Sequence, residues 1–365
     1  MTTKEETSKK KFGTTILVVN PGSTSTKIAV YEDEKPILLR NIRHSVEELK
    51  QFKQAVDQRE FRRDLVIKEL KAMDIPLQFD AIIGRGGLAK PIEGGVYRVN
   101  EKMCKDTYHA MRKHACNLGC IIAYELAIRI PGCQAMIADP GTVDELDNVA
   151  RITGSPLMPR IAIWHALNQR AIARRFAKEQ GKSYEDLNLI ICHLGGGISV
   201  AAHHHGRAID ANNALDGEGP LSPERAGSLP AADLIHLCYS GKYTEDALIK
   251  RIAGQAGLAA HLGTNDVKEI IHRIEEGDKK AELLIDAMIY QTAKSIAAQS
   301  AVLYGKIDAI LLTGGIAYSD YITSRLRERI QFLAPVYIYP GEDEMRALAL
   351  NALAVLRGER EVKDY

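Results

Sequence analysis

The sequence lacks the features of a membrane-spanning, exported or disulfide-built chain. No apolar run in its 365 residues approaches the ~20 residues that cross a bilayer. The stretch up to Lys11 is polar and lysine-rich, which argues against a signal peptide and predicts a flexible leader over residues 1–11. None of the six cysteines forms Cys-x-x-Cys, and most lie in apolar contexts. We therefore expect reduced, mostly buried thiols in a cytoplasmic protein.

Two further absences narrow the possible functions. The formal net charge is only +1, so there is no electrostatic case for nucleic acid or an anionic membrane as a partner. The Walker sequence Gly-x-x-x-x-Gly-Lys-Ser/Thr occurs nowhere, which excludes a phosphate loop of that kind. Any phosphate loop in this chain must therefore be of another type.

A polar loop between two apolar runs is the first candidate for such a loop. The runs Ile16–Val19 and Ile28–Tyr31 are short, β-branched or aliphatic, and bounded by turn residues, which predicts a buried β-hairpin. Gly22 permits a sharp turn, so that hydroxyl and N–H groups can converge on an anion. On these residues alone, a polar turn with an incidental lysine is the alternative. The polar side chains of this loop are Asn20, Ser23, Ser25 and Lys27.

A second hairpin of the same kind is predicted further along the chain. Leu189–Cys192 and Ile198–Ala202 are apolar runs, and the loop between them contains three consecutive glycines, which favour close approach of the backbone to a ligand. At the end of this hairpin, His203-His204-His205 could be a metal-binding run. Its position before Gly206-Arg207 favours a solvated hairpin tip instead.

The chain also carries a short internal repeat. The segments at 80–87 and 308–315 are identical at five of eight positions, and each is an apolar strand that ends in a double glycine. In both halves this strand follows a hairpin, which favours a duplicated domain with a longer insertion in the second copy.

Strands alternate with helices throughout, which predicts the α/β class with two mixed sheets. Amphipathic patterns predict two helices in Val46–Met73 and one each in Asn117–Arg129, Ile161–Gln180, Tyr318–Ile330 and Asp343–Leu356, with strands at Gln134–Ala138 and Val336–Tyr339. Several helices are predicted in Asp233–Tyr304, the longest from about Asp278 to Tyr304. We expect one domain over 12–150 and a second over 151–345, with a helical insertion at about 231–304.

Three motifs together resemble the acetate and butyrate kinase family, within the larger superfamily of sugar kinases, Hsp70 and actin. They are Asn20-x-Gly-Ser-x-Ser-x-Lys27, His193-Leu-Gly-Gly-Gly197 and Thr313-Gly-Gly-Ile316. The resemblance covers nearly the whole chain after Lys11 and is closer to the butyrate kinases, which share the third glycine and the stretch 216–227. It implies a duplicated, two-domain actin-like ATPase fold with ribonuclease H-like domains. It also implies a nucleotide in the cleft between them and a C-terminal helix (about 346–365) that joins the first domain.

The resemblance assigns roles to individual residues. It implies catalytic roles for Arg85, Asp139 and Arg225, and a magnesium-associated role for Asn20 and Glu344. The positions that would bind phosphate or nucleotide are Asn20, Ser23, Ser25, Lys27, His193, Gly195, Gly196, Gly197, Asp266, Gly314 and Gly315.

From the residues alone, several of these positions also have a purely structural explanation. An isolated arginine is more often a surface or salt-bridge residue, although Arg85 lies between glycines at the end of a strand. Asp139 precedes Pro-Gly and could cap a turn, and Glu344 lies in an acidic first helical turn, where the helix dipole favours a carboxylate anyway.

One position departs from the family pattern. Where acetate kinases carry a transition-state histidine, this chain has Ile161, and only the second histidine of that motif, His165, is present. Either the arginines suffice, or His193 takes part of that role.

The implied reaction is reversible transfer of the γ-phosphoryl group of ATP, with Mg²⁺, to butyrate or a related short or branched carboxylate. The resemblance also implies a homodimer or a higher homo-oligomer. Three alternatives remain open: a sugar or other hydroxyl kinase with Asp139 as general base, an ATP-dependent conformational protein, and a phosphohydrolase without an acyl acceptor.

Overall fold

The computed structural model describes residues 13–110, 112 and 114–365, so the predicted leader over 1–11 lies outside the described residues. The chain divides into two compact units. The first contains the chain up to Lys90, then Gly95–Ala138 and Met345–Tyr365, and the second contains Pro91–Gly94 and Asp139–Glu344. The second unit thus begins earlier than the expected boundary at 150/151. The reason is that Val143 and Leu146 pack in the same cluster as Trp164 and Ala201 of that unit.

The first unit is built on a seven-stranded mixed sheet in the order β12-β5-β6-β4-β1-β2-β3. β1 and β2 form the predicted hairpin, and β4 and β6 run parallel to β1. The strands are β1 (Thr15–Pro21), β2 (Ser25–Glu32), β3 (Lys35–Arg43), β4 (Ala81–Arg85), β5 (Val96–Arg98), β6 (Gln134–Ala138) and β12 (Val362–Lys363).

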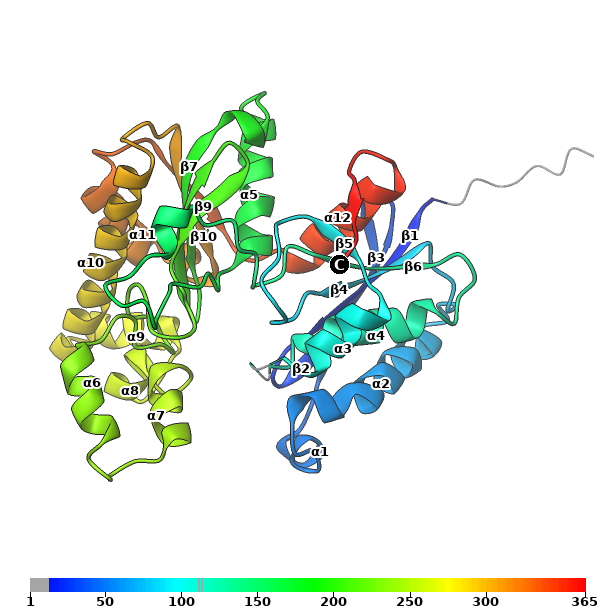
Figure 1. The fold of residues 1–365 in the computed structure, drawn as a ribbon, viewed down its shortest axis with the longest axis horizontal. Helices are drawn as coiled ribbons and strands as arrows, with labels where there is room; N and C mark the ends of the chain where they lie inside the picture. Colours follow the sequence, from blue (N-terminus) through cyan, green and yellow to red (C-terminus); the bar gives the residue numbers. More distant parts are fainter. Residues whose placement is uncertain (1–12, 111, 113) are drawn as a thin grey trace, which may run out of the picture. The chain divides into compact units, whose positions relative to one another are not determined.

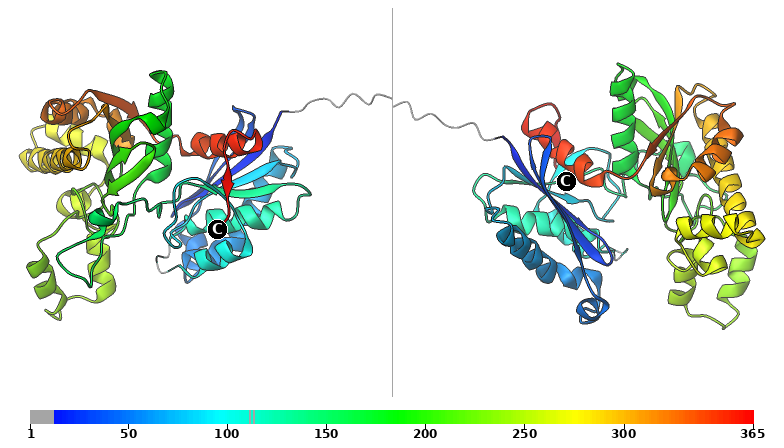
Figure 2. Two further views of the ribbon diagram at one scale, coloured as in Figure 1. Left: turned by 45° about the horizontal axis from the view of Figure 1, so that its top comes forward. Right: turned by 180° about the vertical axis from the view of Figure 1, so that it is seen from behind.

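Helices lie on both sides of this sheet. Figures 1 and 2 show α2, α3 and α4 together on one side and α12 on the other. The helices are α1 (Val46–Lys50), α2 (Arg59–Ala72), α3 (Glu101–Tyr108), α4 (Asn117–Ala127) and α12 (Glu344–Leu356), with a 3₁₀ turn at Ala55–Gln58. The predicted pair of helices in Val46–Met73 is confirmed as α1 and α2.

The second unit has a five-stranded sheet in the order β11-β10-β7-β8-β9. Its strands are β7 (Asn188–Leu194), β8 (Ile198–His204), β9 (Arg207–Ala211), β10 (Ala309–Gly314) and β11 (Val336–Pro340). Its helices are α5 (Ala166–Glu179), α6 (Ala231–Cys238), α7 (Glu245–Ile252), α8 (Gly257–Leu262), α9 (Val267–Glu275), α10 (Lys279–Val302) and α11 (Asp320–Ile330), with 3₁₀ turns at Asn148–Arg151, Tyr184–Asp186 and Gly315–Tyr318.

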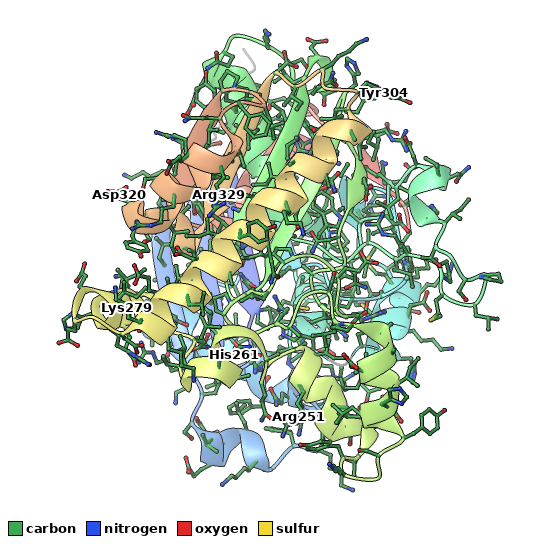
Figure 3. The ribbon with its side chains drawn as sticks, turned by 90° about the vertical axis from the view of Figure 1, so that its left-hand side faces the viewer. Arg251, His261, Lys279, Tyr304, Asp320 and Arg329 are labelled. Atoms are coloured by element: carbon green, nitrogen blue, oxygen red, sulfur yellow. The ribbon has the colours of Figure 1, made fainter. Side chains whose placement is uncertain are left out.

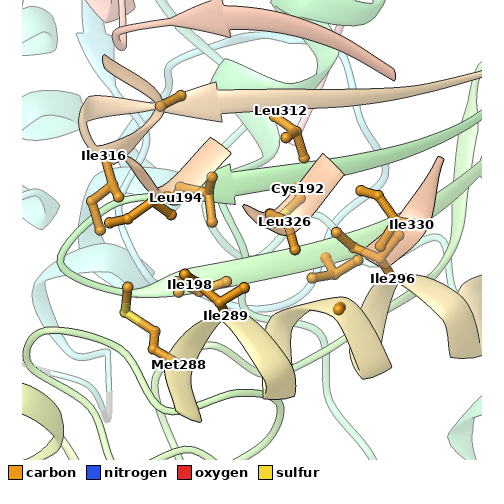
Figure 4. Packing of buried hydrophobic residues seen from close by; sticks show 14 of the residues in the cluster. Cys192, Leu194, Ile198, Met288, Ile289, Ile296, Leu312, Ile316, Leu326 and Ile330 are labelled. Carbon is orange, nitrogen blue, oxygen red and sulfur yellow. The ribbon is translucent and has the colours of Figure 1, made fainter. Parts of the chain in front are cut away.

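Both faces of this second sheet are buried. Successive side chains of a strand point to opposite faces, so β7 contributes to two cores. On one face Ile190, Cys192 and Leu194 join the large core beneath α10 and α11, which Figure 4 shows in part. On the other face Leu189 and Ile191 pack with Phe176 of α5. Figure 3 shows α10 crossing the unit from Lys279 toward Tyr304, with α11 beside it between Asp320 and Arg329. Burial on both faces explains why β7 is a continuous apolar run.

The predicted internal repeat is present in the topology. The order β6-β4-β1-β2-β3 of the first unit matches β11-β10-β7-β8-β9 of the second, with the same parallel and antiparallel pairings. The shared aspartate acts alike in both copies. Asp80 Oδ2 accepts a hydrogen bond from Thr15 N at 2.7 Å, and Asp308 Oδ2 accepts one from Asn188 N at 2.8 Å. Between β9 and β10 the second copy has the helices α6–α10, whereas the first copy has α1 and α2 between β3 and β4.

One predicted helix begins later than expected. The pattern favoured Ile161–Gln180, but α5 begins at Ala166. The preceding residues are held in a non-helical conformation, since Trp164 N donates to Gly141 O and the Trp164 indole N–H donates to Val143 O at 2.8 Å. Burial of this tryptophan overrides the local helical pattern.

Candidate active site

The first candidate loop is the turn of the β1–β2 hairpin. Gly22 N donates to Ser25 O at 2.7 Å and closes the turn. Asn20 is paired with Lys27 across the two strands, so their side chains share a face with that of Ser25. Ser23 and Lys27 are exposed, whereas Asn20 is only 4% exposed. The sequence-predicted residues of this loop therefore form one polar surface.

Arg62 of α2 holds this loop from behind. Its Nη1 donates to Gly22 O and Ser25 O, both at 2.8 Å, and its Nη2 donates to Ser23 O at 3.2 Å. The side chain is fully buried, and burial lowers the pKa of Arg62 to about 10. Sequence reasoning missed this residue, because nothing in the amphipathic pattern of α2 distinguishes it from the neighbouring arginines.

Two further polar groups complete the support of the loop. Gln58 Oε1 accepts hydrogen bonds from Arg62 Nε at 2.9 Å and from Nη2 at 2.8 Å. Thr26 Oγ1 lies 3.1 Å from Arg62 Nη1 and 2.9 Å from His44 Nε2. Burial and the nearby Arg62 charge lower the pKa of His44 to about 4, so this imidazole is neutral at pH 7.

Arg85 lies at the end of β4, in the first unit. Its strand packs tightly on α4, because a Cβ on Gly84 would lie 2.0 Å from Gly119 O, and one on Gly119 would lie 2.4 Å from Arg85 O. The two glycines therefore allow the close approach of α4 that fixes the backbone at Arg85. The side chain is half-buried.

Asp139 begins the second unit in a strained, left-handed backbone conformation with φ of 38°. Its carboxylate is buried and ion-paired with two arginines of α5, at 3.1 Å to Arg170 Nε and 3.4 Å to Arg174 Nη1. Arg170 also contacts Glu145 at 2.9 Å. The negative charge of Asp139 is therefore balanced within its own unit.

A pocket of about 560 Å³ lies in the second unit and contains several of the predicted nucleotide-binding residues. Gly195 and Gly196 of the β7–β8 loop, Asp266 at the start of α9, and Gly315 after β10 all line it. Apolar side chains such as Ile271 and Ile316 add a surface on which a flat ring could pack. The sequence prediction that these distant residues belong together thus agrees with the geometry of this unit.

Two other predicted glycines, Gly314 and Gly197, are each next in sequence to a glycine that lines the pocket. Gly314 has a φ of 93°, and a Cβ there would lie 2.3 Å from Leu194 O, so β10 can approach the loop only without a side chain. A Cβ on Gly197 would lie 1.3 Å from Arg225 Nη1. The third glycine is therefore needed to make room for Arg225.

Arg225 is a part-buried cation whose Nε is shielded from solvent. Its Nε has no hydrogen-bond partner among the described residues. Burial lowers the pKa of Arg225, while the charges of Glu224 and Asp216 act in the opposite direction. Such a guanidinium beside a glycine loop is suited to binding an anion.

His193 lies at the edge of this pocket and is 2% exposed. Its Nδ1 lies 2.8 Å from Asn168 Oδ1, and its Nε2 lies 3.0 Å from Glu342 Oε1. Its ring stacks on that of His165, with centroids 3.8 Å apart. Glu342, which lines the pocket, was missed at the sequence level, where Glu344 was singled out two residues later.

A chain of hydrogen bonds leads from His165 into the core. His165 Nδ1 lies 2.8 Å from Ser199 Oγ, and Gln169 Nε2 donates to the same oxygen at 2.9 Å. Gln169 Oε1 faces His203 Nε2 at 3.0 Å, and Tyr184 OH faces His203 Nδ1 at 2.6 Å.

The expectation of a solvated histidine tip at 203–205 was wrong for His203, which is fully buried, and holds for the exposed His204 and His205. Burial and the charges of Arg170 and Arg174 lower the pKa of His203 to about 3. The physical reason is the strand alternation of β8, which turns this side chain inward.

The remaining two acidic candidates have local roles in the structure. The Asp266 side chain caps α9, accepting from Lys268 N at 2.9 Å. Glu344 begins α12 and does not line the pocket. Within the described residues, no group of three or more His, Cys, Asp or Glu side chains could hold a metal ion. Nor does any helix there have the length and apolarity to cross a membrane.

Comparison with known proteins gives a consistent result. Residues 162–334 match the model of the acetokinase family. The chain is 70% identical to a probable butyrate kinase of Bacteroides thetaiotaomicron and 53% identical to butyrate kinase 2 of Clostridium acetobutylicum, covering 96% of this chain and 99% of each relative. The chain belongs to the acetokinase family. The resemblance of its motifs to that family is thus confirmed.

The acetokinase fold is also found among solved structures. The acetate kinase of Porphyromonas gingivalis has a TM-score of 0.75 to this chain at 16% identity, covering 94% of this chain and all of that one. At this identity the likeness concerns the fold alone. It confirms the predicted class, with two mixed sheets flanked by helices in a duplicated actin-like arrangement.

Proposed function

We propose that this chain is a butyrate kinase, which transfers the γ-phosphoryl group of ATP reversibly to butyrate or a related short-chain carboxylate. The observation that carries the proposal is the pocket of the second unit. It gathers Gly195, Gly196, Asp266 and Gly315, which lie far apart in the sequence, around a space of about 560 Å³. The high identity to relatives named butyrate kinase supports the choice of acid.

The acceptor needs no general base, because a carboxylic acid with a pKa near ~4–5 is already ionised at pH 7. The difficulty is instead that one anion must approach another. Catalysis then consists of positioning the two substrates and stabilising the charge on the transferring phosphoryl oxygens. This explains how Asp139 can be paired with Arg170 and Arg174 without loss of a catalytic base.

Fixed cations would supply that stabilisation. Arg225, with its unpartnered Nε beside Gly197, is the proposed cation of the second unit, and Arg85 is the proposed cation of the first. We assign contact with the nucleotide phosphates to His193 rather than His165, because His193 lies beside Gly195 and Glu342 of the pocket. His165 forms a second layer behind it.

The residues present are compatible with Mg²⁺ that arrives with the nucleotide. Mg²⁺ prefers oxygen ligands and usually keeps several waters and substrate phosphates, so a dedicated protein cage is not needed. Asn20, Asp139 and Glu344 carry oxygen ligands of the right kind. When bound, the ion would neutralise charge on the phosphates.

The length of the acid is not strongly specified by this chemistry. Each additional methylene changes binding by only about 1 kcal/mol, so propionate, butyrate and isobutyrate should all react to some extent. A homodimer or a higher homo-oligomer is part of the proposal, to be checked by light scattering.

A hydroxylamine trap tests the proposed reaction. The full chain is given ATP, Mg²⁺ and, in separate reactions, acetate, propionate, butyrate, isobutyrate or valerate. Formation of hydroxamate fastest with butyrate, and its loss in Arg225→Met, is the expected result. Release of phosphate from ATP without hydroxamate from any acid would instead identify a phosphohydrolase or an ATP-dependent conformational protein.

A further inference from the structure

The side chain of Arg62 is the largest fully buried side chain in the described part of the chain, and its position is unusual. A buried arginine is normally paired with a carboxylate, because an uncompensated charge is costly away from water. The described part of the chain gives Arg62 no ion pair, and its six hydrogen bonds go to backbone carbonyls, an amide oxygen and a hydroxyl.

These contacts determine how the loop presents its polar groups. Arg62 draws the carbonyl groups of Gly22 and Ser23 inward, at 2.8 Å and 3.2 Å. In a trans peptide the N–H of the next residue points opposite to the carbonyl. The N–H groups of Ser23 and Thr24 therefore point away from Arg62, toward the exposed side of the loop, where both side chains are also exposed.

Resting on the proposed function, we propose that Arg62 is a positioning residue for the phosphates of ATP. It turns the peptide groups of the β1–β2 loop so that their N–H groups face an anion, and its buried charge is compensated only when that anion is bound. Arg62 does not touch the nucleotide itself. Without it, the same loop sequence could adopt other turns, because Arg62 Nη2 is the donor that holds the carbonyl of Ser23.

A neighbouring arginine provides a matched control. Arg63 is the next residue of α2, but it is part-buried and pairs with Asp64 at 2.9 Å and Glu125 at 3.0 Å. Arg62→Met and Arg63→Met therefore remove the same group from the same helix, one with contacts to the loop and one without.

The decisive measurement is calorimetric binding of ATP with Mg²⁺ to the full chain, without any acid. Arg62→Met should weaken ATP binding at least 10-fold, and Arg62→Lys, which keeps the charge but not the planar fork, should recover part of it. Arg63→Met should stay within twofold of wild type. Where turnover is measurable, KM for ATP should rise in Arg62→Lys while KM for the acid stays within twofold.

ATP binding by Arg62→Met within twofold of wild type would show that Arg62 serves only the stability of the fold. If Arg62→Met does not fold, Gln58→Leu decides, since it removes the group that orients Arg62 but leaves the charge. A threefold or greater loss of ATP affinity supports the proposal, and a smaller change overturns it. Because no acyl phosphate is measured, a chain that binds ATP but phosphorylates no acid would refute the proposed function and leave this test intact.

Discussion

The two glycine-bearing hairpins share their strand pairing but differ in how an arginine contacts each of them. In the first unit Arg62 gives its guanidinium to carbonyls of the loop, to Gln58 and to Thr26. In the second unit Arg225 lies against Gly197, and its Nε has no partner among the described residues. Arg62 therefore uses its N–H groups to hold the loop. Arg225 has an Nε that makes no hydrogen bond within the described residues and that could donate to a ligand.

The glycines of the two loops differ in the same sense. A Cβ on Gly22 would meet nothing closer than Ser25 O at 3.6 Å, whereas one on Gly197 would collide with Arg225. The first loop is therefore held by the side chain of Arg62 from α2. The second loop depends on Gly197 having no side chain, which leaves room for Arg225. Two copies of one sheet can thus have similar loops that are stabilised by different interactions.

We expect the largest effect for Arg225, whose Nε makes no hydrogen bond among the described residues. Arg225→Met should lower kcat/KM by about 10²–10³-fold, because a preorganised donor to the transition-state charge is lost. The hydroxylamine assay measures this directly. Arg251→Met is the control, since Arg251 is exposed and its guanidinium lies 4.6 Å from the centroid of the Tyr243 ring. Similar losses in both variants would remove Arg225 from the reaction.

The next effect sharpens the contrast between glycines. Gly197→Ala should lower kcat/KM by about 10²-fold, because the new methyl group displaces Arg225 by an ångström or more. Gly22→Ala should change it less than about threefold, since the site has space. Equal sensitivity of the two positions would contradict the different origins of the loops.

A smaller effect is expected where the second loop meets β11. Glu342→Ala removes a partner of His193 Nε2, and kcat/KM for ATP should fall about tenfold, the cost of one charge-assisted hydrogen bond. Glu282→Ala, in an exposed pair with Lys279 that does not line the pocket, should leave it unchanged. Glu344→Ala tests the other acidic candidate in the same assay. A larger loss there than in Glu342→Ala would favour the family-based assignment.

We expect the smallest effect on activity for substitution of His203, which should instead change the pH dependence of stability. The pKa of His203 is about 3 in the folded chain and 6.5 as its ordinary value, so the unfolded chain binds a proton first as the pH falls. Its contribution is constant above pH 6.5, and about 2 kcal/mol is lost by pH 5. His203→Gln should show a shallower decline of unfolding free energy between pH 7 and 5, with activity at pH 7 within about twofold. An unchanged pH slope in denaturant titrations would be the contrary result.

Much of the fold could be predicted from local sequence, because its strands are short apolar runs bounded by turns. The hairpins, β6 and the repeat at Asp80 and Asp308 follow from patterns a few residues long. The start of α5 could not be predicted, since it depends on where the indole of Trp164 is buried. His203 likewise required knowledge of which face of β8 points inward.

The candidate site divides in a similar way. Residues within recognisable motifs, such as Gly195 and Arg225, could be proposed from the sequence. Arg62 and Glu342 could not, because their importance arises from contacts across 40 residues in one case and 149 in the other. Their own helix and turn give no local signal of such contacts.

The division of the chain into units has a consequence for biosynthesis. The chain passes from one unit to the other after Lys90, Gly94, Ala138 and Glu344. The strand β12, which pairs with β5, and most of α12 belong to the first unit but are made last. During translation the second unit is therefore the first to have all its residues, although its sheet comes later in the sequence. Until β12 is synthesised, the sheet of the first unit has an unpaired edge at β5. During that time the edge can pair with the wrong strand.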